Sequence, residues 1–230
     1  SNLAHLLAIS GLHMGLLTGC VFASLRLLLV LVPGVGMRWP VKKFAAVGAL
    51  LAGVGDLVLA GGNVATERAC IMVTVMFVAV LLGRRAVTLR SVAAAALIVL
   101  ALRPETLLGP GFQMSFSATI ALVAFYRALK AHDWSHSRWP RAVRYVGGVA
   151  SSSLVAGAAT APFAAVHFNQ VPHFGLIANM AAVPVMGAVV IPGAVLSAVL
   201  APFGLEGVGF ATMAPAIAWI QSVADTVAGW

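Results

Sequence analysis

Charge is what this sequence has least of, and acidic charge above all. Charged side chains make up 9% of its 230 residues, and only 6 residues are Asp or Glu. A soluble domain carries about 25% charged residues, which keep its surface in contact with water. Here 61% of the residues are hydrophobic. This balance excludes an ordinary soluble domain and indicates a chain whose surface faces lipid.

Several motifs are missing as well. The two cysteines, Cys20 and Cys70, lie inside apolar runs, as small core residues do. No Cys-x-x-Cys or Cys/His metal spacing occurs, and no Gly-x-x-x-x-Gly-Lys-Ser/Thr loop for a nucleotide. His5 and His13 fit hydrogen bonds between helices better than metal ligands. We therefore expect no metal and no cofactor. The short alternating segments of a transmembrane β-barrel are also absent.

What the sequence has is a series of long apolar runs rich in Ala, Leu, Val and Gly. A helix that crosses a membrane needs about 20 such residues, so we expect an all-α protein, a polytopic transmembrane helical bundle of about eight spans. The spans are expected at about residues 13–32, 44–62, 68–83, 91–102, 114–130, 147–166, 176–200 and 208–229.

Two places predict departures from a straight span. The segment at residues 1–12 is apolar but contains a break at Ser10 and Gly11, which favours a half-helix that re-enters the membrane. The seventh segment carries Pro184 and Pro192 and is long enough to be broken into two pieces. Broken helices are tolerated at membrane depth where they face protein or a water-filled cavity.

The basic residues predict how the bundle is oriented. The net charge is +8, with 14 Lys and Arg. Most of these lie in or beside alternate loops: Arg38, Lys42, Lys43, Arg84, Arg85, Arg90, Arg127, Lys130, Arg138, Arg141 and Arg144. Loops rich in Lys and Arg face the cytoplasm. An even number of spans then leaves both termini on the outer side.

Polar side chains inside spans are costly, so each of them needs a reason. Here they gather in four stretches that the expected topology places on outer loops or on adjoining span ends. We expect them to converge on one outward-facing cavity. The candidate site residues are His5, Ser10, His13, Thr66, Arg68, Arg103, Gln113, Ser115, Asn169, His173 and Asn179.

The leading candidates also have a purely structural interpretation. Arg68 would then pair with Asp56 or Glu67 at the end of a span. Arg103 would extend its apolar stem along the bilayer and keep its charge in water. Asn179 would cap or bridge the break before the proline of the seventh segment.

Four segments resemble a known family. HLLAISGLHMGLL at residues 5–17 closely resembles the opening signature of the Competence domain, the membrane core of ComEC-type DNA-uptake channels. Three further segments follow in that family's order: ATERACIM at 65–72, RPETLLGPGFQMSFSAT at 103–119 and TAPFAAVHFNQVPHFGLIANMAAVPVMG at 160–187. The resemblance covers nearly the whole chain, as one transmembrane competence domain at 1–230. One departure precedes Arg68, where the family often has a Pro-Ser pair and this chain has Thr66 and Glu67.

The resemblance implies a channel in the bacterial cytoplasmic (inner) membrane that conducts single-stranded DNA inward during natural transformation. Full-length relatives usually carry an outer OB-like domain before this core, and many carry a β-lactamase-like domain after it. We expect the present chain to be the excised core, without either domain. The implied partners are single-stranded DNA, the lipid bilayer, an outer DNA receptor, a cytoplasmic helicase-like ATPase and single-strand-binding proteins. No enzymatic activity is implied for the core.

Each DNA phosphate carries a charge that is costly in a bilayer, so a DNA path needs cations or hydrogen-bond donors. Arginines would contact phosphates, while amides and histidines would donate hydrogen bonds without choosing a base sequence. The best path candidates are Arg68, Arg103, Gln113 and Asn179.

Other functions stay open. A transporter of small anions or other small solutes would use the same polar cavity, although no inverted repeat typical of many transporters is evident. An intramembrane serine hydrolase would use Ser10 and His13, although the Gly-x-Ser-x-Gly elbow is absent. A purely structural scaffold would leave the clustered outer polar residues unexplained.

Overall fold

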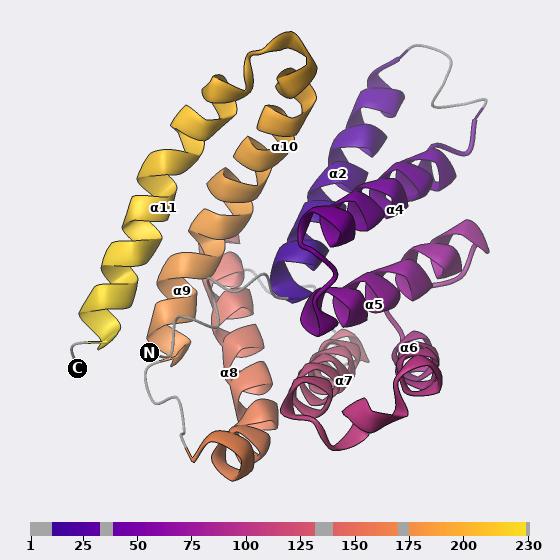
Figure 1. Cartoon of the computed structure of the whole chain (residues 1–230), viewed down its shortest axis with the longest axis vertical. Coiled ribbons are helices and arrows are strands. Elements are labelled where there is room, and N and C mark those ends of the chain that lie inside the picture. The colour runs from indigo at the N-terminus through magenta and orange to yellow at the C-terminus, as the bar shows by residue number, and fades with distance from the viewer. Residues whose placement is uncertain (1–10, 33–38, 132–139, 170–174, 229–230) are drawn as a thin grey trace. The chain divides into compact units, whose positions relative to one another are not determined.

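The computed structural model describes residues 11–32, 39–131, 140–169 and 175–228, which are helical and contain no strand (Figure 1). The α-helices are α2 (Gly11–Leu31), α4 (Val41–Leu59), α5 (Val64–Leu81), α6 (Leu89–Leu102), α7 (Pro110–Ala131), α8 (Arg141–Phe168), α9 (Gly175–Val185), α10 (Ile191–Leu200) and α11 (Glu206–Ala228). Three short helical segments join them: η1 (Pro104–Leu108), η3 (Met186–Val190) and η4 (Ala201–Phe203). The all-α class predicted from the sequence is confirmed.

Six of the described helical segments are long and apolar enough to cross a membrane: His13–Leu31, Val64–Leu81, Pro110–Lys130, Val143–Phe168, Ile177–Phe203 and Glu206–Val227. The remaining two expected spans differ from these. The 19-residue helix α4 carries three charges, Lys42, Lys43 and Asp56. The 14-residue helix α6 is about 21 Å long at 1.5 Å per residue, against a hydrocarbon core of about 30 Å. Each expected span overlaps a helix, so the polytopic helical bundle is confirmed.

The seventh segment, which was predicted to be broken into two pieces at its prolines, is instead continuous but irregular. Helix α9 continues without a gap through η3, a π-helical stretch, into α10. Here the N–H of Ile191 donates to the carbonyl of Met186, five residues back. Pro192 has no N–H to donate to a carbonyl of the preceding turn, so the regular pattern of backbone hydrogen bonds must change there. The interruption is therefore a π-helical stretch within one continuous helix. The predicted half-helix at 1–12 lies almost wholly outside the described residues.

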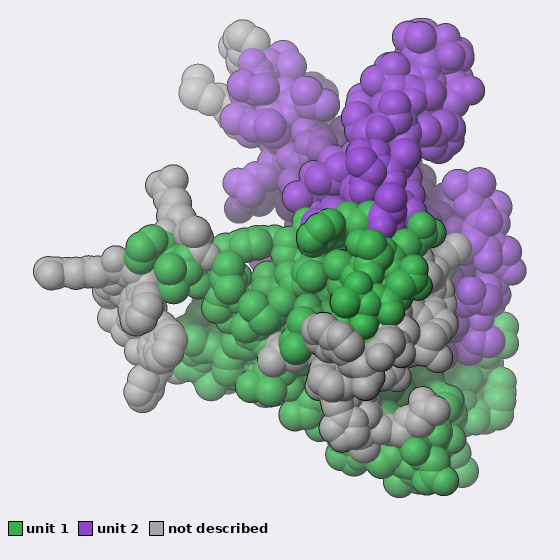
Figure 2. Space-filling view, turned by 90° about the vertical axis from the view of Figure 1, so that its left-hand side faces the viewer, with its two compact units in different colours: residues 1–3, 88–184, 219–230 green, residues 4–87, 185–218 purple. Residues whose placement is uncertain are grey.

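The compact unit called the first unit below comprises residues 4–87 and 185–218, and is shown in purple and labelled unit 2 in Figure 2. Within it, α2, α4 and α5 pack on one another and α10 packs on α2. Helix α4 passes into α5 through Gly61 and Gly62, whose φ angles are 71° and 65°. Glycine adopts this left-handed conformation without the steric cost of a Cβ. The tight turn makes α4 and α5 antiparallel neighbours.

In the same unit, α10 and the start of α11 approach each other closely. The hydroxyl of Ser197 donates to the carbonyl of Glu206 at 3.0 Å. A Cβ built on Gly209 would lie 2.6 Å from the carbonyl oxygen of Gly193 and 2.7 Å from the nitrogen of Ser197. Small residues at a helix contact allow backbones to approach in this way, as is common in membranes.

The second compact unit comprises residues 1–3, 88–184 and 219–230, and is shown in green and labelled unit 1 in Figure 2. Helix α7 packs on α8, and α6 and η1 pack on α7. A hydrogen bond between the hydroxyls of Tyr126 and Ser152 links α7 to α8. The rings of Phe112 and Phe116 lie one turn apart with centroids separated by 4.5 Å. Both rings are buried and form part of the core of this unit.

Candidate functional site

The polar end of the first unit is built around the start of α5. Asn63 is the N-cap of this helix, and its Oδ1 accepts hydrogen bonds from the backbone N of Thr66 at 3.0 Å and from its Oγ1 at 3.1 Å. Asn is among the preferred N-cap residues because its side chain satisfies a free backbone N–H. Thr66 is only 1% exposed. Its hydroxyl therefore completes the helix cap rather than facing solvent.

Arg68 follows two residues later and is half-buried. Its Nε is buried and has no hydrogen-bond partner in the part of the chain that the structure describes, and the same is true of Oδ2 of Asp56 on α4. These two atoms therefore do not bond to each other. For Nε, the expected pairing of Arg68 with Asp56 or Glu67 is not formed, and for the rest of the guanidinium it stays a prediction. A buried donor without a partner is costly, which makes it a good position for a ligand.

His13 on α2 belongs to the same end of this unit. It interacts electrostatically with Asp56. The apolar core beside it contains Met14, Ala69, Cys70 and Val73, with Leu57 packed against it. His13, Asp56 and Arg68 each directly precede a residue of this cluster, Met14, Leu57 and Ala69 respectively. His13 and Asp56 therefore lie at the edge of one packed core, whereas the turn of about 100° per residue directs Arg68 away from the face of α5 that Ala69, Cys70 and Val73 share.

In the second unit, Arg103 lies at the join between α6 and η1. It is the C-cap of α6, and its carbonyl accepts hydrogen bonds from the N and Oγ1 of Thr106, the latter at 2.8 Å. The side chain is exposed. The backbone of Arg103 thus shapes this end of the unit, while its guanidinium is accessible.

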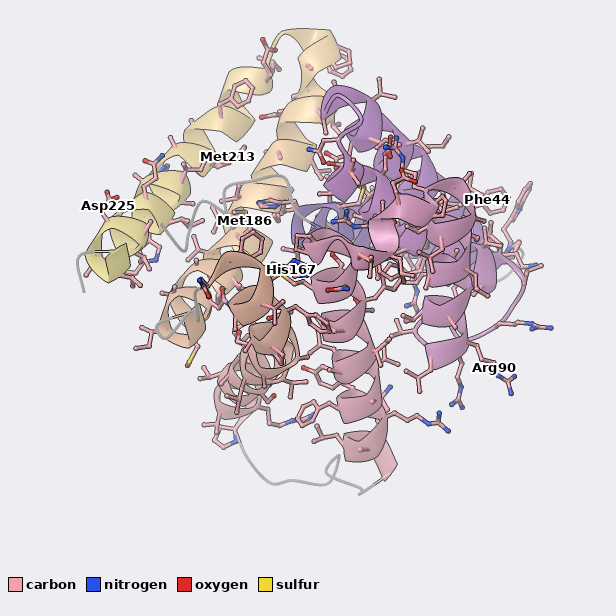
Figure 3. All side chains as sticks on the ribbon, turned by 60° about the horizontal axis from the view of Figure 1, so that its bottom comes forward. Phe44, Arg90, His167, Met186, Met213 and Asp225 are labelled. Carbon is pink, nitrogen blue, oxygen red and sulfur yellow. The ribbon has the colours of Figure 1, made fainter. Side chains whose placement is uncertain are left out.

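Both the nitrogen and the oxygen of the side-chain amide of Gln113, on α7, have hydrogen-bond partners. Its Nε2 donates to the carbonyl of Leu107 at 3.3 Å, and its Oε1 lies 2.9 Å from Nε2 of His167 on α8. Figure 3 labels His167. Two residues beyond His167, α8 ends at Asn169, whose φ of 52° is left-handed. Asparagine tolerates this conformation better than most residues with a Cβ. Asn169 therefore terminates α8 close to the hydrogen bond between Gln113 and His167.

His167 was not among the sequence candidates, although it lies in the fourth family-like segment. In the sequence, His167 is marked by a polar side chain at the end of an apolar helix. Its pairing with Gln113 depends on the packing of α7 on α8. Of the other candidates, Ser115 is half-buried on α7 and accepts from Thr119 through its carbonyl at 2.8 Å. Asn179 is half-buried on α9, beside the buried Ala178.

The structure groups the candidates into two sets. His13, Thr66 and Arg68 belong to the first unit. The second unit holds Arg103, Gln113, Ser115, Asn169 and Asn179. The predicted convergence of all four stretches on one cavity stays a prediction. His5, Ser10 and His173 lie outside the described residues.

The described residues also bear on metal binding. Within the described ranges, no group of three or more His, Cys, Asp or Glu side chains is arranged to hold a metal ion. Cys70 is buried in the core and Cys20 is half-buried, and both are free thiols. The cysteines therefore belong to the helix packing.

The apolar helices and the few polar groups at their ends define the class: this is a multi-pass membrane protein. Comparison with protein families gives a match over residues 1–230, the whole chain, to the family described as Competence protein. The chain belongs to this family, and its role therefore lies in competence, the uptake of DNA by the cell. Neither the curated proteins nor the solved structures include a significant match to the chain.

Proposed function

We propose that this chain forms the membrane channel through which one DNA strand enters the cytoplasm during natural transformation. Membership of the Competence family supports the process, and the apolar helices support a membrane location. The observation that carries the proposal concerns the side chain of Arg68. It lies within a membrane-crossing helix and its Nε is buried without a partner among the described residues.

Placing an arginine within a membrane-crossing helix costs free energy. Ionisable residues inside membrane helices usually mark the path of a charged substrate. A guanidinium binds phosphate through several N–H groups at once, so it fits a polyanion better than a small apolar solute. Contacts to phosphates carry no sequence information. We therefore infer a path that accepts a DNA strand of any sequence.

The charge distribution along α4 and α5 supports an orientation. Lys42 and Lys43 start α4, and Arg84 and Arg85 follow the end of α5, so the antiparallel pair gathers these cations at one end. Arg68 lies near the other end of the pair, close to the start of α5. By the positive-inside rule, the basic end is cytoplasmic and Arg68 belongs to the outer half. In a bacterial inner membrane, both ends of this segment would then face outward.

We propose that the chain is a channel rather than an enzyme, and that the energy for transport comes from other proteins. Single-stranded DNA would be its substrate. An outer DNA receptor, a cytoplasmic helicase-like ATPase and single-strand-binding proteins would be its partners. The sequence itself supports the need for such partners, since it holds no phosphate-binding loop of the nucleotide-hydrolysing kind.

Transformation frequency in cells that carry Arg68→Gln, Arg68→Lys or Arg90→Gln in the full-length protein tests the proposal. Arg90 is exposed on α6 and is the matched control for losing one arginine (Figure 3). A hydrogen bond to a charged group is worth about 1.5–3 kcal/mol, so Arg68→Gln should lower uptake about 10- to 100-fold. Arg68→Lys should retain part of it, and Arg90→Gln should behave as wild type. Membrane abundance is measured by blot in each strain.

Normal uptake by Arg68→Gln at normal abundance would contradict this use of Arg68. Vesicle assays with labelled DNA and labelled small anions separate the two transport functions. If Arg68→Gln lowered the flux of small anions and left DNA uptake unchanged, the chain would be a small-anion transporter instead.

A further inference from the structure

Helix α6 is much shorter than the helix on which it packs. It has 14 residues, from Leu89 to Leu102, whereas α7 has 22 (Figure 1). At 1.5 Å per residue these lengths are about 21 Å and about 33 Å. The hydrocarbon core of a bilayer is about 30 Å thick. Helix α7 is therefore long enough for this core, whereas α6 falls short of it by about 9 Å.

The chain between α5 and α7 nevertheless has to cross the membrane. Helices α5 and α7 are both long and apolar enough to cross it. Each of them ends at cations, with Arg84 and Arg85 after α5, and Arg127 and Lys130 near the end of α7. By the positive-inside rule both of these ends are cytoplasmic, so the intervening chain must return to the outer side. Residues 82–109 are all described, and α6 is their one α-helix.

A hydrogen-bonded cap and a proline fix the two ends of α6. At the start, Oγ1 of the N-cap Thr88 accepts a hydrogen bond from the backbone N of Ser91 at 3.1 Å. At the other end, Arg103 directly precedes Pro104, and a residue before proline avoids the helical conformation. The φ and ψ angles of Arg103 are −143° and 77°. Neither connecting segment therefore lengthens α6.

One face of α6 is packed, and the rest of its surface is apolar and exposed. Val92, Ala95 and Val99 are buried and recur at helical spacing. Leu97 is 69% exposed and Leu102 is 68% exposed. The sequence holds no charged residue from position 91 to position 102. An exposed apolar surface on a helix that crosses the membrane fits the acyl chains of lipids.

Exposed cations flank this apolar surface on both sides. Arg84 and Arg85 come before α6, and Arg103 comes directly after it. Phospholipid headgroups present phosphates at each membrane surface, and a guanidinium binds phosphate through several N–H groups. The helix between the two sets of arginines is only about 21 Å long. Lipids therefore complement this helix along its length, provided that their two phosphate layers lie closer together than usual.

The connecting segments decide how the missing length is made up. A short span is accommodated by a thinner bilayer, by flanking side chains that extend to the surface, or by oligomerisation. Residues 84–88 and Arg103 have irregular backbone, and lipid-exposed irregular backbone is not tolerated in hydrocarbon. Water must therefore reach both ends of α6. Tilting does not help, because a tilted helix spans even less of the membrane.

We propose that α6 binds phospholipids in a locally thinned bilayer, in which the two phosphate layers approach each other by about 9 Å beside the helix. Its apolar face contacts the acyl chains, and Arg84, Arg85 and Arg103 contact the phosphates of the two leaflets. This inference goes beyond the proposed function, because it holds whatever the protein carries. In a channel for DNA, a thinner bilayer shortens the distance over which charged phosphates have to be sheltered from lipid.

Spin labels report the depth of α6 in the bilayer. The full-length protein, with its native cysteines replaced by alanine, is placed in lipid nanodiscs with a nitroxide at Leu89→Cys, Leu97→Cys or Leu102→Cys. All three positions are exposed, so the labels leave the packed face intact. Oxygen, which dissolves in lipid, and a water-soluble nickel chelate are compared as relaxation agents to give each depth. Leu154→Cys is the matched control, because Leu154 is 62% exposed near the middle of the span Val143–Phe168.

The labels at Leu89 and Leu102 should lie at the boundary with water. The label at Leu97 should lie at most about 10 Å below this boundary, which is half the length of α6. The label at Leu154 should lie about 15 Å deep, at the middle of a bilayer of ordinary thickness. Lipids with longer acyl chains should deepen the Leu154 label and leave the Leu97 label unchanged, because α6 sets the local thickness.

Equal depths at Leu97 and Leu154 would overturn the thinning, since α6 would then be sunk in an ordinary bilayer with its arginines extended to the surface. Labels on α6 that neither oxygen nor the nickel chelate reaches would also contradict it, because protein rather than lipid would cover the helix. Neither result bears on DNA uptake, which the Arg68 variants test separately. Failure of this inference therefore leaves the proposed channel standing.

Discussion

Gln113 of α7 and His167 of α8 are joined through Oε1 and Nε2 at 2.9 Å, while Nε2 of Gln113 bonds to the carbonyl of Leu107. A carbonyl can only accept, so the amide nitrogen must face Leu107 and the amide oxygen must face His167. Nε2 of His167 must then carry the hydrogen. One amide therefore holds the segment before α7, α7 itself and the end of α8 together.

We expect this bridge to stabilise the α7–α8 pair measurably. Gln113→Ala and His167→Ala, alone and together, form a double-mutant cycle for the free energy of unfolding in detergent or bicelles. Side-chain hydrogen bonds between membrane helices contribute about 0.6 kcal/mol on average, so the coupling energy should lie between about 0.5 and 1.5 kcal/mol.

The control cycle combines His167→Ala with Thr119→Ala. The hydroxyl of Thr119 bonds to the carbonyl of Ser115 within α7 and does not reach α8. The effects of these two substitutions on the free energy of unfolding should be additive to within about 0.5 kcal/mol. A coupling of zero in the Gln113 cycle would show that this bridge does not stabilise the helix pair.

The contact between α10 and α11 predicts a strong difference between two nearby glycines. In Gly209→Ala the new methyl group would meet Ser197 and the carbonyl of Gly193, and two backbones would have to separate. Overpacking of this kind costs about 1–3 kcal/mol. In Gly207→Ala the methyl group meets nothing within 4 Å, and stability should stay equal or rise by up to about 1 kcal/mol.

Thermal unfolding of the purified proteins, together with their abundance in the membrane, measures this difference. Gly209→Ala should unfold at a lower temperature than wild type and accumulate less. Equal stability of the two variants would mean that α10 and α11 do not approach as closely as described.

The helices could be predicted from the sequence because hydropathy acts locally. A run of apolar residues must form its backbone hydrogen bonds internally in lipid, and only a helix does so within one segment. Helix ends were predicted less well. Helix α8 extends from Arg141 to Phe168, beyond the expected 147–166, because helix caps and turns rather than hydropathy decide where a helix ends.

The site was only partly predictable. Arg68 and Gln113 stood out because polar groups in spans are costly. Whether Arg68 meets Asp56 depends on the register of α5 against α4, which neither segment encodes alone. The partnership of Gln113 with His167 joins residues 54 positions apart, and no short pattern contains it. The π-helical stretch before Pro192 likewise depends on how a long helix absorbs a missing N–H among its neighbours.

The N-cap of α5 predicts an effect at the start of the helix that carries Arg68. Asn63→Ala removes the acceptor for both the N and the Oγ1 of the buried Thr66. Losing an N-cap side chain costs about 1 kcal/mol, and transformation should fall as the start of α5 frays. Asn63→Asp keeps an acceptor in the same place and suits the positive end of the helix dipole, so it should remain near wild type. Unfolding free energies and transformation frequencies of the two variants check this, and equal losses in both would contradict a capping role.

The orientation proposed from the basic loops predicts which side of the membrane each helix end faces. Glu105 in η1 and Arg85 after α5 are both exposed and lie in loops of opposite expected sides. In a protein whose native Cys20 and Cys70 are replaced by alanine, Glu105→Cys should react with a membrane-impermeant maleimide added to intact spheroplasts. Arg85→Cys should react only after the membrane is permeabilised. The reverse pattern would invert the topology, since one expected span, at α6, separates the two loops. Arg68 would then lie in the cytoplasmic half, and a strand would meet it on leaving the channel rather than on entering it.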